Sequence, residues 1–107
     1  MPAYIVSMMH INDADTYSKY TDKTPAIVKK HGGRFLTRGE AYTCVEGKDY
    51  DGRLVILEFP SQADVDAWYN DPEYQQVITY RHAASTMNYL LVQEGSGNTE
   101  NPDPKLG

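Results

Sequence analysis

Apolar residues gather in four runs along the chain, and the length and composition of these runs are typical of β-strands. Each run is short and rich in β-branched or aromatic side chains, which favour extended backbone. Gly39 marks a bulge or bend within the second run, and Pro60 ends the third. The predicted strands are residues 4–9, 34–45, 53–59 and 87–92.

The segment between the first two strands has the periodicity of an amphipathic helix. Larger side chains recur at a spacing of three and four over residues 17–31. Asn12 or Asp13 is the expected N-cap. Pro25 interrupts the pattern, and Thr24 before it is a suitable second N-cap, so we expect either a kink or two abutting helices.

A second helical segment follows the third strand. Ser61 and Asp64 have the spacing of a capping box, and the helix after them carries Val65, Trp68 and Tyr69 on one side. Asp71-Pro72 then restarts the pattern as an N-cap and a first helical position. The stripe of this second helix is Tyr74, Val77, Ile78 and Arg81.

The predicted order of elements is βαββαβ, the order of a ferredoxin-like α+β domain. Right-handed crossovers place both helical segments on one side of a four-stranded antiparallel sheet. Residues 54–57 and 89–92 are nevertheless apolar without a break, as in strands that are buried on both faces. Since monomers rarely expose so large an apolar face, we expect a homodimer in which two sheets face each other as a dimeric α+β barrel.

Length and net charge limit the number of domains and the kinds of partner. The chain has 107 residues, which suits one domain, and we expect that domain over residues 1–94. Residues 95–107 are rich in Gly, Asn and Pro with Leu106 as their apolar side chain, so they are predicted to form a polar, flexible C-terminal tail. A formal net charge of −5 without a basic cluster argues against nucleic acid as a partner.

Membrane and cofactor signals are lacking in the sequence. The apolar run over residues 3–9 is too short to span a membrane and follows no basic residue, so we expect no membrane partner and a cytoplasmic protein. Cys44, the single cysteine, lies in an apolar stretch and is predicted to be packed rather than reactive. Neither metal-ligand spacing, nor a nucleotide-binding glycine loop, nor a nucleophile elbow occurs, so no metal or cofactor is expected.

Two segments resemble the family of domains of unknown function numbered 1330. They are residues 32–39, with the sequence GGRFLTRG, and residues 55–74, which run from VILEFPS to AWYNDPEY. The resemblance covers residues 4–94 and implies a branch of the dimeric α+β barrel superfamily. That superfamily includes cofactor-free oxygenases, haem-degrading enzymes, muconolactone isomerase-like enzymes and small ligand sensors, so the resemblance implies a fold and no one reaction.

Haem binding, which the resemblance to the superfamily raises, is disfavoured by the position of His82. His82 lies roughly where the haem-degrading relatives place a ligand. Its neighbour Arg81 already occupies the inward phase of the helix, so His82 is expected to turn outward by about 100°.

Two arginines are candidate ligand-binding residues in a pocket between the helices and the sheet. Arg81 stands on an apolar helical stripe, where a guanidinium could hold a carboxylate or an enolate through two hydrogen bonds. Its structural alternative is to extend to the helix edge or to pair with Glu58. Arg38 matches the family's Arg-Gly pair, and its alternative is an ion pair with Glu40 or Glu58.

Five further side chains are candidates. Glu58 interrupts an apolar strand and is a candidate general base, although strand-end carboxylates often cap or pair. His10 at the end of the first strand is a candidate proton shuttle, or a loop histidine that faces solvent. Trp68, Tyr69 and Tyr74 would wall the pocket for a planar ligand, or else belong to the core.

The sequence leaves three functions open. The first is an enzyme without metal or organic cofactor that acts on a small anionic or aromatic metabolite, with arginine holding the developing charge. The second is a binding protein for such a molecule without turnover. The third is a structural dimer in which the inward polar groups pair with each other and leave no cavity.

Overall fold

The computed structural model of the chain describes residues 1–97 and 99–102. Its elements confirm the predicted order βαββαβ, with each helical segment divided into two helices. The predicted flexible tail over residues 95–107 falls partly outside the described residues, and its flexibility stays a prediction. The elements are β1 (Ala3–Ile11), α1 (Ala14–Thr21), α2 (Thr24–Lys30), β2 (Arg34–Arg38), β3 (Arg53–Phe59), α3 (Gln62–Tyr69), α4 (Pro72–Ala84) and β4 (Ser85–Glu94).

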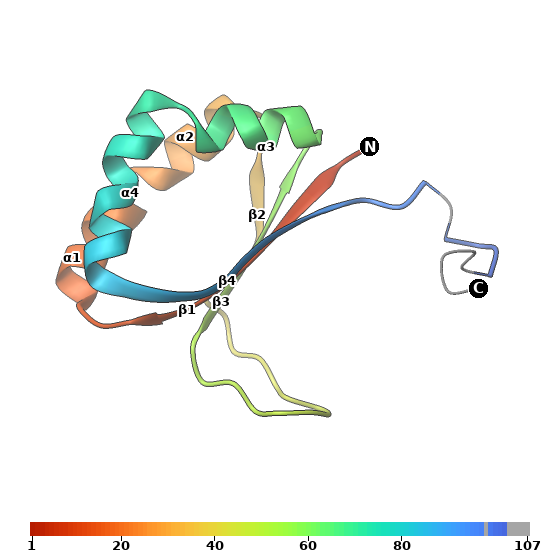
Figure 1. Cartoon of the computed structure of the whole chain (residues 1–107), viewed down its shortest axis with the longest axis horizontal. Helices are drawn as coiled ribbons and strands as arrows, with labels where there is room; N and C mark the ends of the chain where they lie inside the picture. The colour runs from red at the N-terminus through yellow and green to blue at the C-terminus, as the bar shows by residue number, and fades with distance from the viewer. Residues whose placement is uncertain (98, 103–107) are drawn as a thin grey trace.

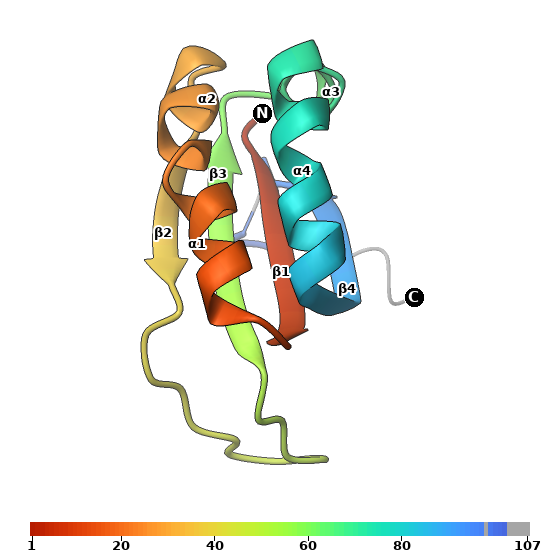
Figure 2. The same ribbon diagram turned by 90° about the vertical axis from the view of Figure 1, so that its left-hand side faces the viewer.

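The four strands form one antiparallel sheet in the order β2-β3-β1-β4. In the central strand β1, Ile5 lies opposite Leu57 of β3 on one side and Val92 of β4 on the other. All four helices cover the same face of this sheet, and the opposite face carries none (Figure 1). In the view turned by 90°, α1 and α2 lie over β2 and β3, and α4 lies over β1 and β4 (Figure 2). The α+β, ferredoxin-like fold is therefore confirmed.

The first helical segment consists of two abutting helices. Of the two expected alternatives, a kink or two helices, this is the second. Asp13 is the N-cap of α1 and accepts a hydrogen bond from the backbone N–H of Thr16. The cap expected at Thr24 is wrong, because the N-cap of α2 is Lys23 and Thr24 is already helical. The Thr24 hydroxyl instead donates to the Tyr20 carbonyl at 2.6 Å, which joins the end of α1 to α2.

The second helical segment begins as its caps predict. The Ser61 hydroxyl oxygen accepts from the backbone N–H of Asp64 at the start of α3, and Asp71 caps α4 with Pro72 at its first turn. Asp71 also accepts hydrogen bonds from Lys30 and His31, each at 2.8 Å, which tie the end of α2 to α4. These partners hold the pKa of Asp71 well below its usual range, the Lys30 bond most of all. None of the described helices has the length and apolar surface that spanning a bilayer requires.

The strand expected over residues 34–45 is shorter than predicted. β2 ends at Arg38, and residues 39–52 form a loop that projects beyond the sheet (Figure 2). Although residues 41–45 are apolar and aromatic, β3 begins only at Arg53, so these residues have no neighbouring strand to pair with. Val45 is consequently 88% exposed.

The prediction that Cys44 is packed in the core is also wrong. Its side chain is exposed within the same loop. The thiol lies 3.4 Å from the carbonyl oxygen of Glu46 and 3.6 Å from those of Gly47 and Lys48. Because β2 ends at Arg38 and not at residue 45 as predicted, Cys44 lies outside the sheet.

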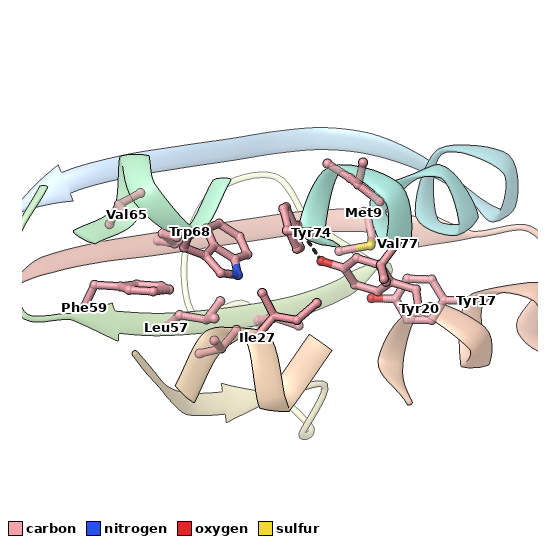
Figure 3. Packing of buried hydrophobic residues seen from close by; sticks show 14 of the residues in the cluster. Met9, Tyr17, Tyr20, Ile27, Leu57, Phe59, Val65, Trp68, Tyr74 and Val77 are labelled. Atoms are coloured by element: carbon pink, nitrogen blue, oxygen red, sulfur yellow. Dashed lines mark hydrogen bonds between the residues drawn. The ribbon is translucent and has the colours of Figure 1, made fainter. Parts of the chain in front are cut away.

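The two faces of the sheet differ in burial. In β3 the side chains of Val55, Leu57 and Phe59 are buried under the helices, and those between them are half-buried on the open face. On β4, Tyr89 and Leu91 are 57% and 54% exposed. The helical face holds the core, which includes the aromatic and aliphatic side chains drawn in Figure 3. The apolar runs thus divide between a core face and an open face that the single chain leaves uncovered.

Candidate functional site

A cavity lies between the helices and the sheet, where the sequence predicts the pocket. Its walls come from β1, β2 and β3 on one side and from α1, α3 and α4 on the other. It holds about 40 Å³ of space for the centres of water molecules, a few times the minimum that one buried water needs. This excludes the reading in which the inward side chains close on one another without a cavity.

Arg81 is buried against this cavity, with 4% of its surface exposed. α4 carries it in phase with Tyr74, Val77 and Ile78, and its guanidinium carbon lies 5.7 Å from the centre of the Tyr20 ring. Its Nε has no hydrogen-bond partner among the described residues. The pairing with Glu58 that the sequence left open does not occur, because Glu58 accepts from Arg34 Nε at 3.2 Å.

Arg53 is a cavity residue that the sequence reasoning missed. It begins β3, and its guanidinium carbon lies 5.6 Å from the centre of the Tyr17 ring. Its Nε, like that of Arg81, is buried and has no hydrogen-bond partner in the described part of the chain. As the first residue of a predicted strand it gave no signal of its own. The nearby Gly39 is the one clue, because the Arg53 guanidinium fills the space beside that glycine.

Arg38 also lines the cavity but is exposed at its edge. Its guanidinium carbon lies 4.6 Å from the centre of the Phe35 ring. In the described part of the chain it forms no ion pair with Glu40 or Glu58; Glu40 instead accepts from the Arg38 backbone N–H. The cavity therefore has three guanidinium groups on its walls, each set over an aromatic ring.

A row of aromatic side chains forms the rest of the wall. The Trp68 and Tyr74 rings lie 4.2 Å apart, and the Tyr74 hydroxyl is 2.7 Å from the Tyr20 hydroxyl (Figure 3). Trp68 Nε1 is buried, and no described residue accepts a hydrogen bond from it. Burial raises the pKa of the Tyr74 hydroxyl and, to a lesser degree, that of Tyr17, so both stay protonated at neutral pH.

Tyr69 does not reach this cavity. It is 36% exposed and contacts the edge of Trp68, with 6.1 Å between ring centres. With Asn70 and Val92 it lines a separate depression beside α3 and β4. Of the three aromatic residues that the sequence proposes as pocket walls, Trp68 and Tyr74 line the cavity and Tyr69 does not.

The two candidates for proton transfer stand apart from the cavity. Glu58 lies on the open face, opposite Arg34 of β2 and Tyr4 of β1, and its side chain is 26% exposed. A general base for a ligand in the cavity would have to point inward, whereas the alternation of β3 turns Leu57 and Phe59 inward and Glu58 outward. The proposed roles of Glu58 and His10 in proton transfer stay predictions.

His10 forms a cluster at the foot of the projecting loop. Its Nε2 is 2.7 Å from Asp51 Oδ1, and its Nδ1 is 2.7 Å from Asn88 Oδ1, which also accepts from the Tyr50 hydroxyl. The hydrogen bond to Asp51, with that to Asn88, raises the pKa of His10. His82 is exposed on α4, as its outward phase predicts.

The walls of the cavity thus offer cations and N–H donors without an ionised acceptor. Arg38, Arg53 and Arg81 are among the lining residues, which include no Asp, Glu or His. Elsewhere in the described chain, no three His, Cys, Asp or Glu side chains are arranged to hold a metal ion. Such an arrangement can bind an anion and hold it against aromatic rings.

Comparison with protein families and solved structures agrees with the fold. The model of a family described as Domain of unknown function (DUF1330) matches residues 2–95. No protein of the curated set matches the chain.

Several solved structures have the same fold at low sequence identity. A protein of unknown function from Rhodopseudomonas palustris, RPA0582, is similar with a TM-score of 0.73 and 18% identity, over 91% of this chain and 84% of that one. SnoaB, a cofactor-independent oxygenase from Streptomyces nogalater, is similar with a TM-score of 0.62 and 14% sequence identity, over 94% of this chain and 98% of that one. HapK from Hahella chejuensis has a TM-score of 0.62 and 14% sequence identity, over 94% of this chain and 99% of that one. At these identities the likeness is one of fold, the ferredoxin-like α+β arrangement of this chain.

Proposed function

Since the chain belongs to the DUF1330 family, whose description assigns no reaction, we propose a function from its cavity: the protein binds a small organic anion between its helices and its sheet. The observation that carries this proposal is a set of buried N–H donors that have no hydrogen-bond partner among the residues that the structure describes. They are the Nε atoms of Arg53 and Arg81 and the Nε1 of Trp68.

The free-energy cost of leaving these donors without hydrogen bonds favours a bound ligand. A buried polar group without a hydrogen bond costs about 1–3 kcal/mol, and an unpaired buried charge costs more. All three donors belong to residues that line one cavity, and that lining has no carboxylate to satisfy them. A bound carboxylate would accept from the guanidinium groups and offset this cost. The ligand rather than the chain then supplies the negative charge.

Binding is favoured over catalysis by the same lining. Proton abstraction needs a base within hydrogen-bond reach of the substrate. Glu58 and His10 do not line the cavity, and burial raises the pKa values of the Tyr17 and Tyr74 hydroxyls that do, which keeps both neutral. The likeness to SnoaB is at 14% identity and concerns the fold. The proposed function is therefore the capture of an anion that arrives already ionised.

A second copy of the chain is proposed as the partner. The open face of the sheet carries Tyr89 and Leu91, both more than half exposed. Val6 and Met8 of β1 lie beside them in register, and Leu54 and Ile56 of β3 continue the face on the far side of β1. A contiguous apolar face of this kind is typical of an interface between subunits.

Titration of small carboxylates tests the anion site. Trp68 is the only tryptophan, and it lines the cavity, so its fluorescence reports binding there. We expect acetate and propanoate to change this fluorescence with saturation in the wild-type protein and to lose at least tenfold in affinity in Arg81→Met. Arg34→Met is the matched control, because Arg34 is an arginine of the open face. No saturable change with any carboxylate would refute the proposal.

A further inference from the structure

We propose that Arg38 is the entry residue of this cavity: its positive charge attracts the anion to an opening between β2 and α1, ahead of the two buried arginines. The proposal rests on the proposed anion site and adds the route by which its ligand arrives. The observation behind it is the uneven exposure of the cavity wall. Among the described residues that line the cavity, Arg38 is the one exposed side chain.

The half-buried side chains of the wall place the opening. Besides Arg38, the lining residues that are not fully buried are Thr21, Phe35, Arg53 and Leu90. Thr21 ends α1, Phe35 lies in β2 and Arg53 begins β3, where α1 lies over these two strands (Figure 2). Leu90 is the exception, and it also lines the separate depression beside α3 and β4, which accounts for its exposure. The opening is therefore at the end of β2, beside α1.

Arg53 connects the end of β2 to α1 at this opening. Its guanidinium fills the space beside Gly39, the residue that directly follows Arg38. The guanidinium carbon lies 5.6 Å from the centre of the Tyr17 ring of α1. Arg53 Nε is buried, and no described residue accepts a hydrogen bond from it. An anion that passes Arg38 therefore meets Arg53 next.

The charge of Arg38 is not neutralised by a partner. Arg38 forms no ion pair in the described part of the chain, and its guanidinium carbon lies 4.6 Å from the centre of the Phe35 ring. The face of a ring attracts a guanidinium and leaves its positive charge in place. Glu40, the acid nearest to Arg38 in sequence, accepts from the Arg38 backbone N–H. The positive charge at the opening thus stays available to an anion in solution.

The charge of the whole chain makes such a residue necessary for fast binding. The formal net charge of −5 repels an approaching anion on average. Salt limits the reach of each charge to a Debye length of about 10 Å at 0.1 M ionic strength, so the charges nearest to the opening dominate there. Arg81 is 4% exposed, and an anion reaches it only after it has entered. Arg38 is the positive charge of the cavity that the anion meets first.

The association rate of propanoate tests the proposal. Because Trp68 is the only tryptophan and lines the cavity, a single indole N–H signal reports binding in a two-dimensional nitrogen–proton NMR spectrum. Relaxation dispersion of that signal gives the dissociation rate constant, a fluorescence titration gives Kd, and their ratio gives the association rate constant. At about 10 mM salt, Arg38→Met should slow association about fivefold and change dissociation by less than about twofold. At about 1 M salt, the variant and the wild-type protein should associate at the same rate, because salt screens the charge.

Three further variants separate attraction from contact. Arg38→Lys keeps the charge and loses the forked donors, so it should keep the fast association of the wild-type protein. Glu40→Gln removes the acid beside the opening, and it should speed association about twofold in low salt. Arg34→Met is the matched control, because Arg34 belongs to the same strand and its side chain pairs with Glu58 on the open face. The control removes the same charge from the chain and should change neither rate constant.

The outcomes of the two proposals are distinguishable. If propanoate does not bind to the wild-type protein, the proposed function fails and this inference falls with it. If propanoate binds and Arg38→Met associates as fast as the wild-type protein in low salt, the anion site stands and the entry role is refuted. Slow association that persists in high salt, or that Arg38→Lys shares, also refutes it, because Arg38 would then act through its shape or its hydrogen bonds rather than its charge.

Discussion

The guanidinium of Arg53 lies against Gly39, in the space that a side chain at position 39 would need. A β-carbon built on Gly39 would come within 2.8 Å of the guanidinium carbon of Arg53, closer than real contacts allow. Gly39 also has a φ of +78°, a conformation that residues with a side chain rarely adopt. This glycine therefore turns the chain out of β2 and at the same time seats a cation of the cavity.

The first prediction concerns that glycine. Gly39→Ala should destabilise the fold by about 1–2 kcal/mol through backbone strain and should also displace Arg53, which weakens propanoate binding at least fivefold. Gly47→Ala is the matched control, because Gly47 has a φ of +90° and nothing within 4 Å of its built β-carbon. The control should show the strain and unchanged affinity. Urea denaturation and Trp68 fluorescence titration measure the two effects, and equal affinities in both variants would contradict the role of Gly39.

The second prediction concerns the stability of the Arg81 variant. Arg81 pairs with no carboxylate of residues 1–97 or 99–102, so Arg81→Met removes a buried charge and keeps much of the aliphatic stem. The free energy of unfolding should stay the same or rise by about 1 kcal/mol. A loss of about 3 kcal/mol or more would instead show that the guanidinium belongs to a buried pair. Urea denaturation without ligand decides the matter.

The third prediction is the protonation of His10. Both ring nitrogens face oxygen atoms, and the bond to Asp51 raises the pKa of His10 above its ordinary value of about 6.5. A raised pKa in the folded state gives stability that is complete below the unfolded pKa and is lost as pH rises through the folded pKa. The proton NMR titration of His10, assigned with His10→Gln, should show a raised midpoint that falls in Asp51→Asn. An unchanged midpoint in that variant would exclude Asp51 as the cause.

The fourth prediction concerns the open face. The protein should have the mass of a dimer in light scattering at low micromolar concentration, because two apolar faces bury each other. Leu91→Lys places a charge on that face and should halve the mass. Tyr80→Lys is the control, since Tyr80 is 36% exposed on the helical side. A monomer mass for the wild-type protein would remove the second copy as the partner.

Local patterns were sufficient for most of the fold. The spacing of apolar residues and the caps at Asp13, Ser61 and Asp71 identify the elements, because they are decided within a few residues of sequence. Residues 41–45 show where that reasoning ends. Their composition is typical of a strand, but a strand also needs a neighbour, and the start of β3 at Arg53 leaves them without one.

The site was less predictable than the fold, for two physical reasons. Arg81 was identifiable because a charge on an apolar helical stripe is a local anomaly. Arg53 was not identifiable, since its position depends on Gly39, which follows the end of β2, and on the Tyr17 ring. Glu58 was a candidate general base from its place in an apolar strand, but β3 is apolar on both faces, so its sequence does not tell which face turns inward.

The loop over residues 39–52 has a consequence for protein engineering. At its base, the Tyr42 hydroxyl lies 2.8 Å from the Tyr50 carbonyl and 2.7 Å from that of Gly52, so the two ends of the loop are fastened together. Within the loop, a β-carbon built on Gly47 would have no atom within 4 Å. Lengthening a loop twofold costs only about 0.6 kcal/mol of closure entropy. A foreign peptide inserted at Gly47 would therefore be displayed away from the cavity while the parent domain folds as before.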